Sequence, residues 1–219
     1  MRVAIVAAGA RMKDTKKLRR LLESVDRILC ADGGWDTLED LGIRPDVLLG
    51  DFDSVKKKRA PQKLQSLCAE RGITVQTFPT RKAETDTELA LDYALQQGAD
   101  EVILLQGTGN RWDHSLSNIF LLPSFAARGL HVCMVDEWNQ IDYLSAGKHE
   151  LSGIDPTWYV SFLAFPEDVH LSLSGFDYNL DHMLVRNGSS LGVSNHLLGK
   201  IGTIEVFGKG VYRILSCGQ

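Results

Sequence analysis

The strongest constraint on the fold of this 219-residue chain is an alternation of short apolar runs with longer amphipathic segments. The runs are rich in β-branched residues, and the segments between them have the length of helices. This alternation is typical of an α/β protein in which helices cover a parallel sheet. We predict six strands in this part of the chain: Arg2 to Ala8, Arg27 to Ala31, Asp46 to Leu49, Thr74 to Phe78, Glu101 to Leu105 and His131 to Val135.

Beyond about Asn139 the pattern changes to brief alternating runs separated by Gly, Asn and Asp. Such runs are typical of a small antiparallel sandwich or barrel. We therefore expect two domains, an α/β domain over residues 1–138 and an all-β domain over residues 139–219. The expected later strands include Trp158 to Phe165, His170 to Leu173, Gly202 to Phe207 and Val211 to Leu215.

The composition excludes several classes of protein. A formal net charge of −4 argues against a sequence-independent nucleic-acid binder, which would carry a basic face. No stretch approaches the roughly 20 apolar residues that span a bilayer, so we expect no membrane segment. The apolar run Met1 to Gly9 resembles a signal peptide but is short, and we interpret it as a buried strand of a cytoplasmic protein. The four cysteines are scattered without a C-x-x-C pair, which favours buried free thiols.

Polar residues cluster just after the predicted strands of the first domain. The clusters are Asp32 to Gly34, Gly50 to Ser54, Arg81 to Asp86 and Gly107 to His114. Ligands of open α/β sheets bind at the carboxyl ends of the strands. We therefore expect these four loops to converge on one site.

The sharpest cluster holds two carboxylates, Asp51 and Asp53, one residue apart. Mg²⁺ usually takes one or two carboxylates together with phosphate oxygens and water. The pair therefore indicates a magnesium site, and the structural alternative is a turn in which Asp53 caps the next helix.

A second acidic loop opens a helix. Thr85 and Glu88 have the spacing of a capping box, which gives Glu88 a structural role. Asp86 falls in the first turn, where the helix dipole stabilises a carboxylate. It becomes a third metal ligand only where this loop meets the Asp51 loop.

The remaining clusters suit an anionic ligand. Gly33 and Gly34 allow close approach of backbone, and Arg111 can clamp phosphate oxygens. Asp113 either caps a helix or orients a partner, and His114 is given a supporting role. The chain has neither G-x-x-x-x-G-K-[ST] nor G-x-G-x-x-G, so phosphates are held without these motifs. Carboxylates, arginine and glycine-rich strand ends together indicate phosphoryl or nucleotidyl transfer.

In order along the chain, five blocks resemble those of the thiamine pyrophosphokinase family. They are Ala31 to Gly34, Pro45-Asp46 with Gly50 to Ser54, Thr85-Asp86 with Glu88 to Leu91, Arg111 to His114 with Asn118, and Gly188 to Asn195. The resemblance covers nearly the whole chain. It implies transfer of the pyrophosphoryl group of ATP to thiamine, giving thiamine diphosphate and AMP. It also implies an ATP- and Mg²⁺-binding first domain, a thiamine-binding second domain, and a homodimer with active sites between subunits.

The resemblance also assigns roles to residues. It implies metal ligands at Asp51, Asp53 and Asp86, with a further catalytic acid at Asp46. It implies ATP binding by Asp32, Gly33, Gly34, Arg111, Asp113 and His114. For thiamine, Ser194 and Asn195 match the family's Ser-Asn pair, and Tyr178 matches an aromatic that stacks on the ring. An aromatic on a strand is otherwise a core residue.

Two positions depart from the family pattern. Ala83 stands where bacterial relatives often carry an acid, and Trp35-Asp36 stands where Ala-Asn is usual. These departures leave open a thiamine or nucleotide sensor without catalysis. A separate alternative is a nucleotide-sugar transferase with Asp51-Phe52-Asp53 as a metal-binding D-x-D motif.

Overall fold

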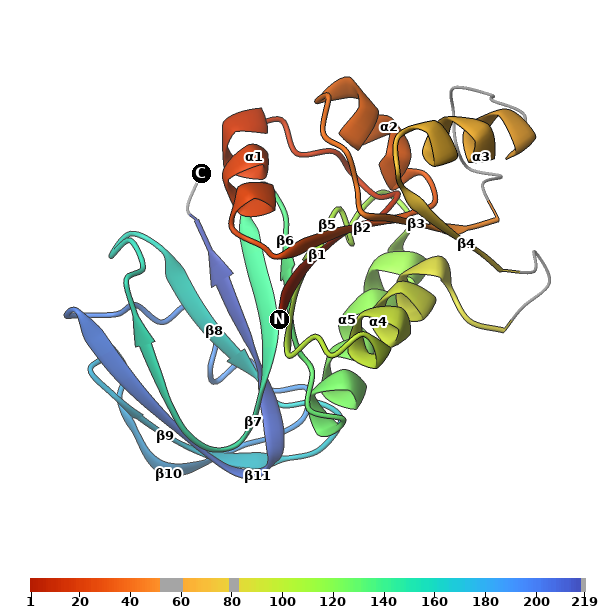
Figure 1. The fold of residues 1–219 in the computed structure, drawn as a ribbon. Coiled ribbons are helices and arrows are strands. Elements are labelled where there is room, and N and C mark those ends of the chain that lie inside the picture. Colours follow the sequence, from red (N-terminus) through yellow and green to blue (C-terminus); the bar gives the residue numbers. More distant parts are fainter. Residues whose placement is uncertain (52–60, 79–82, 218–219) are drawn as a thin grey trace. The chain divides into compact units, whose positions relative to one another are not determined.

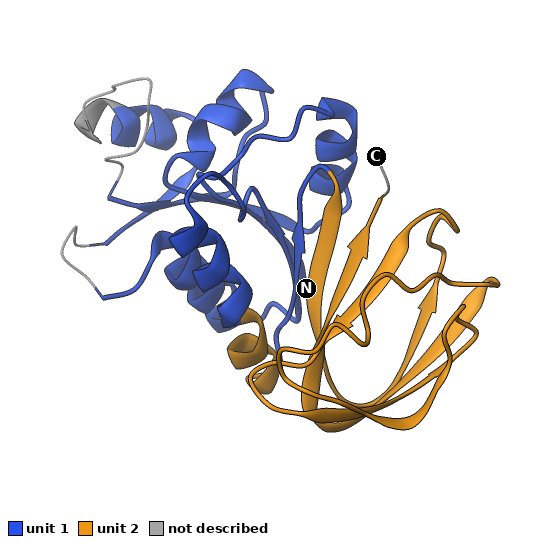
Figure 2. Cartoon of the chain, turned by 180° about the vertical axis from the view of Figure 1, so that it is seen from behind, with its two compact units in different colours: residues 1–121, 129–137 blue, residues 122–128, 138–219 orange. Residues whose placement is uncertain are grey.

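The computed structural model of this protein describes residues 1–51, 61–78 and 83–217. The chain separates into two units, which Figure 2 colours differently. Unit 1 comprises Met1–Leu121 and Gly129–Glu137, and unit 2 comprises Leu122–Arg128 and Trp138–Gln219. The predicted class, a parallel-sheet α/β part followed by an all-β part, is confirmed.

Within the described residues, the sheet of unit 1 has six parallel strands in the order β6-β5-β1-β2-β3-β4. All six predicted strands are present, three of them with the predicted bounds. The order reverses between β1 and β5, and such a switch point is where open α/β sheets bind ligands. The bounds are β1 Arg2–Val6, β2 Arg27–Ala31, β3 Val47–Gly50, β4 Thr74–Thr77, β5 Glu101–Leu105 and β6 His131–Val135.

Helices cover both faces of this sheet. Figure 1 shows α1, α2 and α3 on one face and α4 and α5 on the other. On the first face, Trp35, Leu38 and Leu64 are buried in an apolar core together with residues of the strands. The bounds are α1 Thr15–Glu23, α2 Gly34–Asp40, α3 Pro61–Glu70, α4 Asp86–Gln96 and α5 Trp112–Ala127.

The start of unit 1 is tied to its end. The Lys17 Nζ atom donates to the carbonyl oxygens of Asp136 and Glu137 at 3.0 and 3.1 Å, just after β6. In return, the Glu137 carboxylate accepts from the backbone nitrogens of Lys13 and Asp14 at 2.7 and 3.3 Å. The entry to α1 is thereby fixed against the last strand of the unit.

Unit 2 is an antiparallel sheet in the order β10-β9-β11-β7, with β8 also paired to β11. It encloses a separate apolar core, in which the rings of Phe162 and Phe176 meet edge to face at 5.9 Å. The bounds are β7 Asn139–Ser152, β8 Tyr159–Leu163, β9 Val169–Ser174, β10 Leu180–Val185 and β11 Ile201–Ser216.

One prediction for unit 2 was wrong. The runs over 202–207 and 211–215 are not two strands but one, β11, whose register shifts between Val206 and Gly210. A Cβ atom at Gly210 would lie 2.4 Å from Cε1 of Tyr143, so this glycine allows close packing on β7. The glycines therefore mark an irregularity within a strand and not a turn.

The cysteines are free thiols. Cys30 and Cys68 are buried as expected, and burial raises the pKa of both thiols. Cys133 and Cys217 are only partly buried. In the part of the chain that the structure describes, no helix is both long and apolar enough to cross a membrane.

Candidate active site

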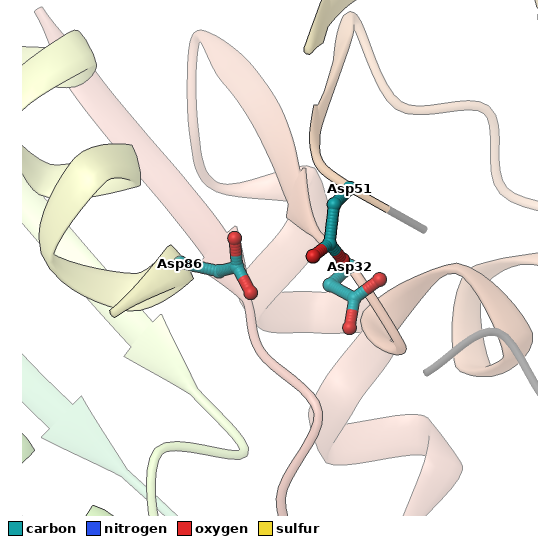
Figure 3. A group of neighbouring side chains, drawn as sticks. All are labelled: Asp32, Asp51 and Asp86. Carbon is teal, nitrogen blue, oxygen red and sulfur yellow. The ribbon is translucent and has the colours of Figure 1, made fainter. Parts of the chain in front are cut away.

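Three carboxylates of unit 1 converge at the carboxyl edge of the sheet (Figure 3). Asp32 follows β2, Asp51 follows the neighbouring strand β3, and Asp86 is the first residue of α4. Each contributes a carboxylate oxygen, and these oxygens all lie within 4.8 Å of one another. The Asp86 loop therefore meets the Asp51 loop.

Local backbone geometry brings Asp32 and Asp51 together. The Asp32 backbone nitrogen donates to the Leu49 carbonyl at 2.8 Å, which continues the pairing of β2 with β3. Gly50 then adopts a φ of 139°, and a Cβ atom there would lie 3.2 Å from the Cβ of Asp32. A side chain at position 50 would crowd Asp32.

The start of α4 presents Asp86. The Thr85 side chain accepts from the Glu88 backbone nitrogen at 3.2 Å, so Thr85 is the N-cap. This bond satisfies one of the amides that a helix leaves unpaired in its first turn. Asp86 follows directly and is held by the fixed beginning of the helix.

The three carboxylates fit a hard divalent cation. Asp32 is only 4% exposed, and Asp51 and Asp86 are half-buried. Negative charges this close repel one another, and a cation among them removes that repulsion. Oxygen-only ligands suit hard cations such as Mg²⁺, Ca²⁺ and Mn²⁺ and do not by themselves select one of them.

Two predicted residues are not part of this group. Asp53 lies outside the described residues. Asp46 precedes β3 whereas Asp51 follows it, and five residues of extended chain, roughly 16 Å, separate them. The Asp46 Oδ2 atom accepts from the Ile28 backbone nitrogen at 2.8 Å. The expectation for Asp46 is thus corrected, because its carboxylate joins β3 to β2 at the end of the strand remote from Asp51.

A cavity of about 750 Å³ in unit 1 borders the three carboxylates. The predicted residues Gly33, Arg111 and His114 line it. Asp113 and Gly34 do not line it, and each instead contacts a neighbouring residue or element. A Cβ atom at Gly34 would lie 2.1 Å from the Val6 carbonyl oxygen, so the glycine lets α2 approach β1 closely.

Asp113 orients Arg111. The Arg111 Nε and Nη2 atoms donate to the two Asp113 carboxylate oxygens at 3.2 and 2.5 Å. This pairing lowers the pKa of Asp113 and raises the pKa of Arg111. An arginine is charged at neutral pH in any case, so the pairing serves to orient the guanidinium beside the cavity.

Sequence reasoning missed part of the cavity wall. Gly9 and Gln106 line it from the loops after β1 and β5, and the Gly9 nitrogen donates to the Gln106 carbonyl at 3.0 Å. Asn118, which the sequence placed in a family block without a role, also lines it, and its Nδ2 atom donates to the Gly107 carbonyl at 2.7 Å. Gly9 carried a usable signal, since a glycine after the first strand marks close backbone approach, but Gln106 carried none.

The predicted thiamine residues come together in unit 2. The Asn195 Oδ1 atom accepts from the Tyr178 nitrogen at 3.0 Å, and its Nδ2 atom donates to the Tyr178 carbonyl at 2.8 Å. Asn195 is 3% exposed, whereas Tyr178 is 62% exposed. Ser194 has a φ of 62° and donates from its nitrogen to the Ser161 hydroxyl. Asn195 thus holds the backbone that presents the Tyr178 ring to solvent.

Comparison with known proteins finds the same two parts. Residues 18–134 match the thiamin pyrophosphokinase catalytic domain, and residues 148–209 match the thiamin pyrophosphokinase vitamin B1 binding domain. The thiamine pyrophosphokinase of Bacillus subtilis is 34% identical over 181 residues, which cover 82% of each chain.

Solved structures agree with this match. A Bacillus subtilis thiamine pyrophosphokinase has a TM-score of 0.85 at 31% identity, and each chain is covered completely. The Geobacillus thermodenitrificans thiamin pyrophosphokinase has a TM-score of 0.84 at 30% identity, with 100% and 99% coverage. The Candida albicans enzyme, at 17% identity and a TM-score of 0.81, shares the fold. With both domains matched and the acidic cluster in the first of them, this chain belongs to the thiamine pyrophosphokinase family.

Proposed function

We propose that this enzyme transfers the pyrophosphoryl group of ATP to the hydroxyl of thiamine, giving thiamine diphosphate and AMP. The observation that carries the proposal is the group of Asp32, Asp51 and Asp86 beside a cavity large enough for a nucleotide. Mg²⁺ held by these carboxylates would neutralise phosphate charge, and Asp53 remains predicted as a further ligand.

The reaction joins the thiamine oxygen to the β-phosphorus and breaks the bond between this phosphorus and the oxygen that leaves with AMP. The hydroxyl proton passes to a carboxylate of the acidic group, which lies at the same edge of the cavity. Arg111, oriented by Asp113, would balance the charge of the phosphates. Catalysis then depends mainly on positioning and on electrostatic stabilisation.

Thiamine would bind to unit 2. Tyr178, Ser194 and Asn195 lie within the residues that match the vitamin B1 binding domain. The exposed ring of Tyr178 suits stacking on an aromatic ligand. Asn195 would contribute through Tyr178, because its amide already bonds the backbone of that residue.

We further propose a homodimer with active sites between subunits. Trp112, Leu116 and Phe120 are spaced four residues apart on α5 and are 72%, 43% and 50% exposed. Such spacing gathers the three side chains on one face of the helix. An exposed apolar stripe of this kind supports burial against a second copy.

We place the enzyme in the cytoplasm, where ATP is available and its free cysteines remain reduced.

The deciding experiment measures AMP release from ATP and Mg²⁺ with and without thiamine, with mass detection of thiamine diphosphate. We expect AMP and thiamine diphosphate in equal amounts, and neither after chelation with EDTA. ADP with thiamine monophosphate would instead identify a simple kinase. Ligand binding without AMP release would favour a sensor, and sugar transfer without thiamine would favour the transferase.

A further inference from the structure

Gln106 is an unusual residue in the wall of the cavity. It follows β5 directly, is 2% exposed and lines the cavity. Its φ of 57° lies in the left-handed region, which is unfavourable for a residue with a Cβ atom. Strained backbone of this kind is concentrated at functional sites.

The carboxamide of Gln106 is only partly hydrogen-bonded. Its Oε1 atom accepts from the Thr37 hydroxyl at 3.2 Å, and this bond holds one end of the amide against α2. The Nε2 atom is buried, and no hydrogen-bond partner for it occurs among residues 1–51, 61–78 and 83–217. A buried donor without a partner is costly, so an acceptor supplied by a ligand would stabilise this arrangement.

The Gln106 side chain lies at the switch point of the sheet. Its backbone belongs to the end of β5, and its amide reaches Thr37 on α2. Between them, Gly9 of the loop after β1 donates to the Gln106 carbonyl, and a Cβ atom at Gly9 would lie 2.2 Å from that oxygen. The carboxamide therefore bridges the place where ligands of such sheets bind.

The distance from the acidic group indicates which part of a ligand reaches Gln106. In the strand order, β5 is two strands from β2 and three from β3. At 4.7–4.9 Å per strand, the backbone of Gln106 lies roughly 10–14 Å from the strand ends that carry Asp32 and Asp51. A nucleotide whose phosphates lie at the acidic group extends over about that length, so its nucleoside would reach Gln106.

We propose that Gln106 is a specificity-determining residue of the donor-nucleotide site. Its Nε2 atom donates to an acceptor of the nucleoside, a ring nitrogen or a ribose oxygen, while Thr37 holds the other end of the amide. The inference rests on the proposed function, in which ATP is the donor.

The test compares the wild type with Gln106→Leu, which keeps the size of the side chain and removes both polar atoms. Calorimetric titration measures the Kd values of adenosine, AMP and Mg²⁺-pyrophosphate. We expect the Kd values of adenosine and AMP to rise by about 3- to 10-fold, the effect of one hydrogen bond, and that of pyrophosphate to stay unchanged. An unchanged adenosine Kd, or a weaker pyrophosphate affinity, would overturn the proposal.

Gln106→Gly provides a second variant because glycine adopts a positive φ without strain. It retains the backbone even where Leu at this position prevents folding. The same loss of adenosine affinity is expected, with a circular dichroism spectrum like that of the wild type. Adenosine affinity equal to that of the wild type in this variant would contradict the proposed contact.

Failure of the inference is distinguishable from failure of the proposed function. If the wild type forms thiamine diphosphate and the variants keep the wild-type affinity for adenosine, the proposed role of Gln106 is wrong and the proposed function still holds. A wild type that binds none of the three ligands would remove both.

Discussion

At the residue scale, the acidic group concentrates negative charge in a partly buried place. Asp32, Asp51 and Asp86 have carboxylate oxygens within 4.8 Å of one another, an arrangement that repels in the absence of a cation. The group is therefore poorly suited to a purely structural role. Its members should matter for activity far more than for folding.

The contrast between Asp32 and Asp46 tests this assignment. We expect Asp32→Asn to lower kcat/KM by at least about 100-fold, since the loss of a metal ligand removes several kcal/mol of charge stabilisation. Asp46→Ala should instead leave activity nearly unchanged and lower the free energy of unfolding by about 1 kcal/mol, through loss of its bond to Ile28. Steady-state kinetics and urea unfolding of both variants check the pair. Loss of activity in the Asp46 variant alone would reverse the two roles.

The sequence predicted two of these three carboxylates as metal ligands, and Asp32 only as a nucleotide-binding residue. Asp51 and Asp86 belong to recognisable acidic loops, whereas Asp32 is a single acid before two glycines. Its place depends on the pairing of β2 with β3 and on the φ of 139° at Gly50. These are tertiary features, which spacing along the chain does not reveal.

At the element scale, the contact between α2 and β1 depends on one missing side chain. We expect Gly34→Ala to destabilise the protein by about 1–3 kcal/mol, because its Cβ atom would lie 2.1 Å from the Val6 carbonyl oxygen. Gly199→Ala is the matched control, since nothing lies within 4 Å of its Cβ position. Chemical denaturation measures both. Equal stability of the two variants would show that α2 shifts without cost.

The beginning of α1 makes a prediction about pH. Asp14 is the N-cap and accepts from the Lys16 and Lys17 nitrogens, and these bonds lower its pKa below 3.8. A lowered pKa in the folded state means stabilisation that is present above about pH 4 and is lost as the pH falls through the folded-state value.

We therefore expect Asp14→Ala to have a lower Tm than the wild type at pH 7, with the difference shrinking below pH 4. Asp14→Asn should remain close to the wild type at pH 7, because its amide oxygen still caps the helix. Thermal unfolding followed by circular dichroism between pH 2 and pH 7 checks both variants. A difference for Asp14→Ala that stays constant over this range would contradict a role of the carboxylate charge.

Elements with strong periodicity were predictable, and irregular ones were not. β2, β5 and β6 have the predicted bounds because each is a short apolar run between polar residues. β7 and β10 were not predicted, because neither alternates regularly: β7 has four buried residues followed by four exposed ones, and β10 has three exposed residues in a row. β11 was divided in two because glycines at a strand irregularity have the same composition as a turn.

At the scale of the whole molecule, the proposed sharing of active sites between subunits predicts complementation. Asp86→Asn should inactivate unit 1, and Tyr178→Ala should impair unit 2. After both variants are unfolded and refolded together in equal amounts, about half of random dimers are mixed, and each mixed dimer has one intact site of two. We expect about a quarter of the wild-type activity, measured as AMP release. Activity no higher than the average of the separate variants would place each site within one chain.

The hydrogen bonds between the start of α1 and the end of β6 have a consequence for folding during synthesis of the chain. Lys13 and its partner Glu137 are 124 residues apart, and β1 pairs with β5, which is made about a hundred residues later. Such non-local contacts slow folding, and unit 1 cannot close while Glu137 is still within the ribosome. One edge of β1 can pair early with β2, but its other edge stays unpaired until β5 has emerged. A chaperone that shelters the first thirty or so residues would be most needed during that interval.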